Sequence, residues 1–172
     1  TDDPVFLQRA LSRAVTAVGR TALFDALVAG LDYAGRGTHP RKVLVVVSDG
    51  GDNASAATLA EVTRLVQASN TTIYTVTLAD PLDRDANPKR MAELAKISGG
   101  EAFRPRDRGA VAGVLAGIAR DIRHTYTLGY APLSPPDGAW RQVRVVVAPS
   151  TGQRVVVRTR TGYLSPPARR SI

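Results

Sequence analysis

The sequence predicts an α/β fold, a Rossmann-like doubly wound parallel sheet followed by a C-terminal antiparallel β appendage. Through residue 124, apolar β-branched runs alternate with segments of helical periodicity. This order is typical of parallel strands joined by right-handed crossovers. Beyond residue 124, short β-prone segments follow one another with turns and no helix between them. We therefore expect an α/β part over residues 1–124, the appendage over 125–164 and a flexible tail over 165–172.

Five segments have the apolar spacing of amphipathic helices. These predicted helices cover residues 4–18, 21–34, 56–68, 88–97 and 111–122. Asp3 can cap the first helix and Pro4 suits its first turn, while Asn87 before Pro88 caps the fourth. Thr21, at the start of the second helix, is either an ordinary N-cap or part of a site.

Six segments rich in β-branched residues predict the strands. They cover residues 42–48, 71–78 and 102–103 in the α/β part, and 125–130, 141–147 and 154–160 in the appendage. In the appendage, valines alternate with other residues as in half-buried antiparallel strands.

The strand at 42–48 carries five consecutive large apolar residues, which is typical of a strand buried on both faces of a parallel sheet. It leads into Ser48 and Asp49, and open α/β sheets place ligand sites at the carboxyl ends of their strands. We therefore expect a polar ligand at Asp49, most simply a cation. The alternative is an ordinary turn in which Asp52 or Asn53 caps the helix that follows.

The composition excludes several kinds of site. The chain has no cysteine and only two histidines, so we expect no disulfide, thiolate chemistry or His-based metal cluster. No apolar run is long enough to cross a membrane. Residues 101–172 carry the whole net charge of +8, with 12 Arg against 4 acidic residues. These arginines are dispersed along strand-like segments, which argues against specific nucleic-acid binding.

Two motifs resemble parts of the metal-ion-dependent adhesion site of von Willebrand factor type A (VWA) domains. Thr21 lies in a Gly-Arg-Thr-Ala-Leu element at a predicted helix start. Asp49 lies 28 residues later in a Ser-Asp-Gly element that ends a hydrophobic strand. The appendage, with Tyr-Thr-Leu-Gly-Tyr at 126–130 and Thr-Gly-Tyr at 161–163, resembles the tail of bacterial VWA-related proteins of the acidobacterial kind. The resemblance extends from residue 4 to 164.

The resemblance implies a site held by Thr21 and Asp49, with Ser48 as an additional candidate, around Mg²⁺, Mn²⁺ or Ca²⁺. The family's first motif, Asp-x-Ser-x-Ser, is absent from this chain. The chain thus resembles the C-terminal two-thirds of such a protein, and we expect weak or no cation binding by it alone because Mg²⁺ requires six oxygen ligands. The missing strands would also leave the strand at 42–48 with an unpaired edge, which favours self-association. The acidic loop at 80–87 lacks the glycine and glutamate of an EF-hand.

The function implied by the resemblance is an interaction or adhesion module, not an enzyme, which binds a partner protein's carboxylate through the cation. The resemblance also implies an extracellular or periplasmic location. No signal is visible, and the chain begins without Met, so we expect a fragment or processed product. Two alternatives stay open. One is a scaffold that binds an anionic surface or polymer through the basic C-terminal half. The other is a phosphotransfer or nucleotide-using enzyme, although the chain lacks phosphate-binding glycine motifs.

Overall fold

The computed structural model describes residues 3, 5, 9, 20–78, 86–148, 152 and 155–168. Its helices are α2 (Leu23–Gly35), α3 (Leu59–Ala68), α4 (Pro88–Ser98), the 3₁₀ helix η1 (Arg108–Ala110) and α5 (Val111–Arg123). Its strands are β1 (Lys42–Val47), β2 (Thr71–Val76), β3 (Ala102–Phe103), β4 (Trp140–Gln142) and β5 (Gly162–Leu164). Most of the helix expected over 4–18, and most of the acidic loop, lie outside the described residues. Among the described residues, no helix has both the length and the apolar character to cross a membrane.

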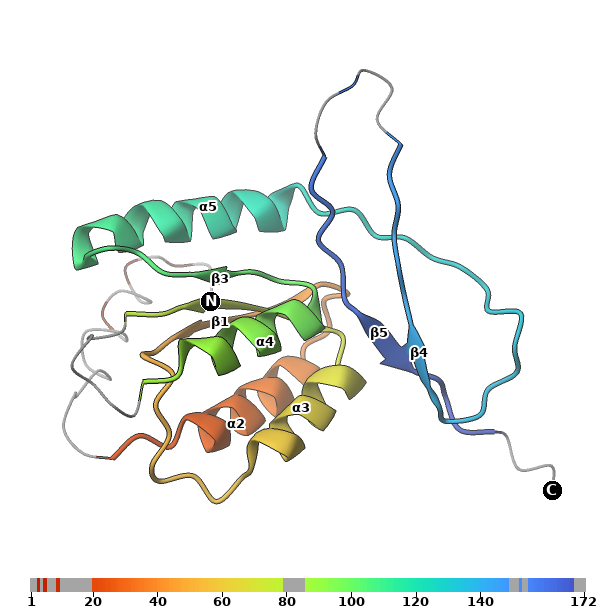
Figure 1. Cartoon of the computed structure of the whole chain (residues 1–172), viewed down its shortest axis with the longest axis horizontal. Coiled ribbons are helices and arrows are strands. Elements are labelled where there is room, and N and C mark those ends of the chain that lie inside the picture. The colour runs from red at the N-terminus through yellow and green to blue at the C-terminus, as the bar shows by residue number, and fades with distance from the viewer. Residues whose placement is uncertain are drawn as a thin grey trace.

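A three-stranded parallel sheet in the order β1-β2-β3 confirms the parallel pairing expected from the sequence. Helices α2, α3 and α4 pack on one face of this sheet, against Leu44, Val46 and Ile73. Helix α5 packs on the other face, where its Ile118 meets Tyr74 and Val76 (Figure 1). The fold is therefore mixed α/β, with helices on both faces of the parallel sheet.

Local capping explains where two helices begin. Thr58 and Glu61 form a reciprocal capping box, so α3 starts at Leu59 rather than at residue 56. Asn87 Oδ1 accepts the Arg90 N–H, and Pro88 occupies the first turn of α4, as expected. Thr21 is not an N-cap, because Ala22 holds that position before α2 and makes no side-chain capping bond.

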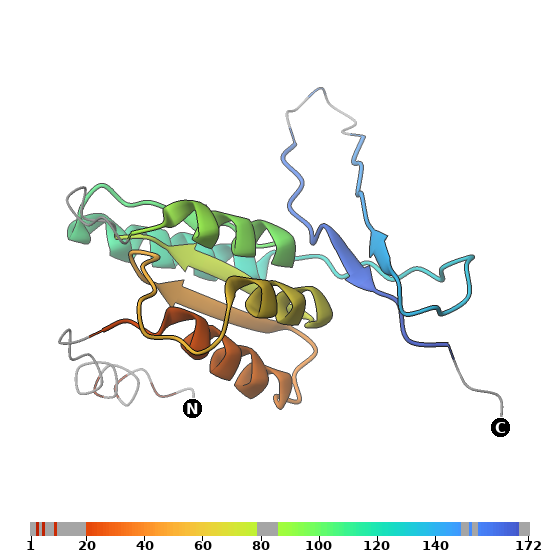
Figure 2. The ribbon, with the colours of Figure 1, turned by 60° about the horizontal axis from the view of Figure 1, so that its bottom comes forward.

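The appendage differs from the three-stranded expectation. A two-stranded antiparallel sheet of β4 and β5 forms instead, and residues 125–130 are not a strand. The Val143 N–H donates to the Thr161 carbonyl at 3.0 Å. Beyond this contact, the segment that follows β4 and the segment that precedes β5 separate as two extended legs. Figures 1 and 2 both show these legs projecting away from the α/β body. The beginning of the expected tail is held in place, because Ser165 is buried and its N–H donates to the Ala139 carbonyl.

Arg160 fastens the appendage to the body. Its guanidinium donates to the Gln67 and Ser69 carbonyls at the C-terminal end of α3 and to Asn70 Oδ1. Such carbonyls lack partners within a helix, and a cation there also matches the helix dipole. Gly99 ends α4 with φ +87°, and a Cβ at Gly99 would lie 2.5 Å from the Arg160 nitrogen. A larger residue at position 99 would therefore push the appendage off the body.

The outer edge of β1 is open in the described part of the chain, where β1 pairs only with β2. Leu44 and Val46 are packed, whereas Val45 and Val47 remain 39% and 52% exposed. Among the described residues, β1 is thus paired along one edge, and its face toward α5 is covered at Val43 but exposed at Val45 and Val47. The edge carries no proline and only Lys42 as a charged residue, so its unpaired backbone has little protection against strand pairing.

Replacing Arg160 by Met should lower the free energy of unfolding by about 2 kcal/mol, because carbonyls at the end of α3 lose charged donors. Urea unfolding measures this loss. Arg144→Met is the matched control, since Arg144 is exposed and makes no hydrogen bond within the described residues. A loss no larger than that of the control would contradict the fastening role of Arg160.

Replacing Val47 by Lys should reduce concentration-dependent self-association, because a charge on the uncovered face opposes edge-to-edge pairing. Sedimentation velocity over a wide range of concentrations measures the association. Val156→Lys, at an exposed valine far along the chain in the appendage, is the control and should leave association unchanged. Equal association of wild type and Val47→Lys would show that β1 is not the contact.

Candidate functional site

The predicted site residues lie around the C-terminal end of β1. Ser48 and Asp49 directly follow this strand, and the Ser48 N–H donates to the Val76 carbonyl of β2 at 3.1 Å. Thr21 precedes α2, and its carbonyl accepts the N–H groups of Asn53 and Ala54 at 3.0 and 3.1 Å. Asn53 lies four positions after Asp49, so the Cα atoms of these two residues are at most about 14 Å apart. Thr21 and Asp49 therefore belong to neighbouring segments at one edge of the sheet, and their joint binding of an ion stays a prediction.

The loop over residues 49–57 wraps around the N-terminal end of α2. Asp52 Oδ1 and Ser55 Oγ accept the Phe24 N–H at 3.2 and 3.0 Å, and Ser55 Oγ also accepts the Asp25 N–H. These N–H groups have no partner inside the helix, so the loop supplies them. The expectation that Asp52 or Asn53 caps the following helix is wrong, because both residues bind the segment around α2 and Thr58 caps α3.

Asp25 completes this arrangement from the helix side. Its two carboxylate oxygens accept the Ala57 and Ala56 N–H groups at 2.8 and 3.0 Å. These backbone hydrogen bonds, that of Ala57 first, lower the pKa of Asp25 below its ordinary value of 3.8. Asp25 therefore holds the loop rather than serving as a free ligand.

The remaining polar atoms define what the site can offer. Asp49 Oδ1 accepts the Gly51 N–H at 2.9 Å, while Asp49 Oδ2 accepts no hydrogen bond from the described residues. Ser48 Oγ accepts the Gly50 N–H at 3.1 Å. Gly50 is buried with φ +87°, and a Cβ there would lie 2.7 Å from the Asn87 carbonyl oxygen. Only glycine therefore allows this turn to bring the Asp49 carboxylate to the sheet edge.

Thr77 is a site residue that the sequence analysis missed. It follows Val76 on β2, beside Ser48, and it is 3% exposed. Its hydroxyl is buried without a hydrogen-bond partner in the described part of the chain. The sequence gives no sign that Thr77 lies beside Ser48. That placement depends on the register between β1 and β2, which neither strand's sequence reveals alone. A further oxygen is thus present close to Ser48.

These groups can contribute oxygen ligands but do not complete a cation site. Within the described ranges, no three His, Cys, Asp or Glu side chains converge as a metal site of that kind would require. Thr21, Ser48 and Asp49 supply at most three of the six oxygens that Mg²⁺ takes. Among the described residues of this edge, the hydroxyls of Ser48 and Ser55 donate to the carboxylates of Asp49 and Asp52, and neither a histidine nor a cysteine accompanies them.

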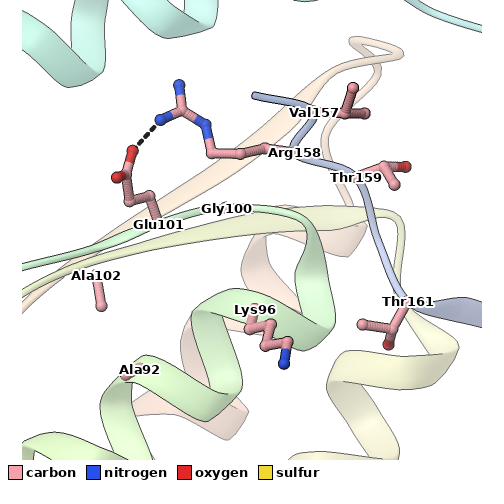
Figure 3. Close-up of a pocket in the computed structure, with 9 residues that line it drawn as sticks. All are labelled: Ala92, Lys96, Gly100, Glu101, Ala102, Val157, Arg158, Thr159 and Thr161. Atoms are coloured by element: carbon pink, nitrogen blue, oxygen red, sulfur yellow. Dashed lines mark hydrogen bonds and ion pairs between the residues drawn. The ribbon is translucent and has the colours of Figure 1, made fainter. Parts of the chain in front are cut away.

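A cavity of about 330 Å³ lies at the opposite end of the sheet, where the appendage meets α4 and the start of β3. Figure 3 shows Arg158 of the appendage paired with Glu101 at its rim. The Arg158 guanidinium also pairs with Asp121 of α5. Lys96, Thr159 and Thr161 add polar groups to the lining. The cavity therefore marks a fastening point of the appendage, and its one carboxylate among the described lining residues is neutralised.

Comparisons with known proteins identify no family. No protein-family profile matches the chain, and no curated protein matches its sequence. Among solved structures, the chain is similar to a crystal structure of an uncharacterized membrane-spanning protein from Vibrio fischeri. That similarity has 24% identity and a TM-score of 0.42, over 70% of this chain and 67% of that chain. A likeness of this level supports no argument about function.

Replacing Asp25 by Asn should weaken the acid dependence of stability. The pKa of Asp25 is lower in the folded chain than in the unfolded chain, so its contribution is present above about pH 4 and disappears as the pH falls through the folded pKa. Unfolding midpoints in urea between neutral pH and about pH 2.5 measure this dependence. Asp32→Asn, on the exposed side of α2, is the control. An unchanged acid limb in Asp25→Asn would contradict the role given to Asp25.

Proposed function

We propose that the chain is a protein-interaction module of the VWA type with an incomplete metal-ion-dependent adhesion site. The observation that carries the proposal is the position of Asp49, one of whose carboxylate oxygens accepts no hydrogen bond from the described residues at the sheet edge that also holds Thr21. Helices on both faces of a parallel sheet support the Rossmann-like, doubly wound arrangement that the motif resemblance implies.

The proposed role is binding rather than catalysis. Thr21 would ligate Mg²⁺, Mn²⁺ or Ca²⁺ directly, Asp49 directly or through water, and Ser48 would be an additional ligand. Open coordination positions on the ion would then take a carboxylate from a partner protein. This chemistry needs a cation with exchangeable positions but no activated nucleophile or acid–base pair.

An Asp-x-Ser-x-Ser strand beside β1 would supply the missing oxygens. The open edge of β1 and the exposed Val45 and Val47 support a place for such a strand. A parallel strand there would also satisfy the backbone groups along that edge. The same resemblance underlies the proposed extracellular or periplasmic location.

The chain alone should bind Mn²⁺ with a dissociation constant weaker than about 1 mM, because fewer than six protein oxygens are present. Paramagnetic broadening of backbone amide signals by Mn²⁺ locates the ion. We expect broadening centred on residues 20–22 and 48–52 that disappears in Asp49→Asn. Asp32→Asn is the matched control and should broaden as wild type. Broadening that persists in Asp49→Asn would contradict the proposed ligand.

A longer form of the protein that includes an upstream Asp-x-Ser-x-Ser segment provides the stricter test. Calorimetry should then show Mg²⁺ or Mn²⁺ binding that Asp49→Ala removes. Equal affinities of the two proteins would reject the adhesion-site proposal.

A further inference from the structure

The C-terminal arm, defined as the two legs at residues 144–148 and 155–159, is extended but makes no strand pairing. The last ladder contact below it is the Val143 N–H donating to the Thr161 carbonyl. Above that contact, no backbone hydrogen bond involves the described residues of either leg. Two runs of strand-forming residues therefore expose their N–H and C=O groups, although such groups in folded proteins are normally paired or solvated.

The arm also exposes several apolar side chains. Val146 and Val156 are 74% and 75% exposed, and Val147, Val155 and Val157 are exposed beside them. A contiguous exposed apolar surface of this kind marks an interaction site more often than a free surface. Figures 1 and 2 show from two directions that most of the arm stands away from the helices, whereas its base at residues 157–159 lines the cavity beside α4.

The positive charge of the C-terminal half favours an acidic partner for the arm over a second copy of the arm. The C-terminal residues 101–172 carry all of the net charge of +8. Arg158 and Arg160 are engaged with Glu101, Asp121 and carbonyl groups of the body. Arg144, on one leg, is exposed and makes no hydrogen bond among the described residues. A second copy of the arm would bring like charges together, whereas an acidic partner would find a cation beside the valines.

We propose that the arm binds an extended acidic segment of a partner protein by strand addition. Main-chain hydrogen bonds would pair the partner with a leg, valine contacts would cover one face, and a partner Glu or Asp would meet Arg144. A strand satisfies the unpaired N–H and C=O groups of the leg, whereas lipid chains leave such groups without partners. A polypeptide therefore fits the arm better than a membrane does.

The test uses the full chain and a synthetic probe, the capped hexapeptide Val-Glu-Val-Glu-Val-Glu. Fluorescence anisotropy measures its binding, and amide chemical-shift changes locate it. We expect shifts confined to the two legs and their flanks. A peptide of the same sequence that is N-methylated at every residue cannot donate strand hydrogen bonds from either edge, and we expect it to bind at least about tenfold more weakly. The Val-Lys hexapeptide should bind no more tightly than the N-methylated one.

Three variants separate the contributions. The double variant Val146→Ser, Val156→Ser should weaken binding by about tenfold, since it removes exposed apolar contacts. Arg144→Gln should weaken it by about threefold and reduce its salt dependence, while Arg64→Gln on α3 is the charge-matched control and should bind as wild type. The substituted positions are exposed, and thermal unfolding checks that each variant folds.

Four results would overturn the proposal. They are equal binding of the N-methylated peptide, no binding up to millimolar peptide, binding only to vesicles of anionic phospholipid, and arm-dependent dimerisation in place of peptide binding. A further control separates this surface from the cation site, because Asp49→Ala and chelation of divalent ions should leave peptide binding unchanged. Loss of binding under either condition would assign the peptide to the cation site and reject the arm.

Discussion

The parallel pairing of β1 with β2 is the constraint on which the rest of the structure depends. Its register runs from Lys42 beside Thr71 to Val47 beside Val76, so both strands end at the same edge. Asp49 and the loop around α2 lie at this C-terminal end of the strands, whereas Arg160 and the appendage lie at the N-terminal end. Because the strands are parallel, their C-terminal ends all lie at one end of the sheet, and the polar residues that follow them lie there too. The two surfaces proposed for binding are therefore separated by the length of the strands.

The strand that organises the sheet is also its least protected part. Leu44 and Val46 bury their side chains against the helices, but Val45 and Val47 lie beyond the cover of α5. Five apolar residues in a row are suited to a strand with neighbours on both edges and helices on both faces. In the described part of the chain, β1 has a paired strand along one edge only.

The basic C-terminal half is less available to polyanions than its composition suggests. Arg141 donates to the Ser134 carbonyl and pairs with Asp137, Arg158 pairs with two carboxylates, and Arg160 binds carbonyls at the end of α3. Partial burial at the end of α3 lowers the pKa of Arg160 from its ordinary value. A scaffold that binds an anionic polymer would need these side chains free.

Helices and parallel strands could be predicted because their signals are local. Apolar spacing located α3, α4 and α5 within a few residues, and Asn87 with Pro88 located a cap. The appendage strands could not be predicted in this way. Valine-rich legs have the propensity for strands, but a strand also needs a partner, and register between distant segments is not written in either segment alone.

The site shows the same division. Ser48-Asp49-Gly50 was recognisable at a strand end, and its position at the sheet edge agrees with that expectation. The roles of Asp25, Asp52 and Ser55 were not predictable, because their hydrogen bonds join residues about thirty positions apart and depend on α2 lying beside the loop. A carboxylate beside a glycine turn looks the same in sequence whether it caps the next helix or the previous one.

The fastening of the appendage makes the two surfaces energetically separable. Arg160 and Thr161 attach at the ends of α3 and α4, through the Ser69 and Ile97 carbonyls, and neither residue contacts the loop around α2. Coupling between the surfaces would require an element with two arrangements that both surfaces bias. β2 is the element that extends from one end to the other, and all of its residues except Thr72 are buried between packed helices. A rigid, fully packed strand positions both ends but offers no second arrangement, so binding at the arm and binding at Asp49 should be independent.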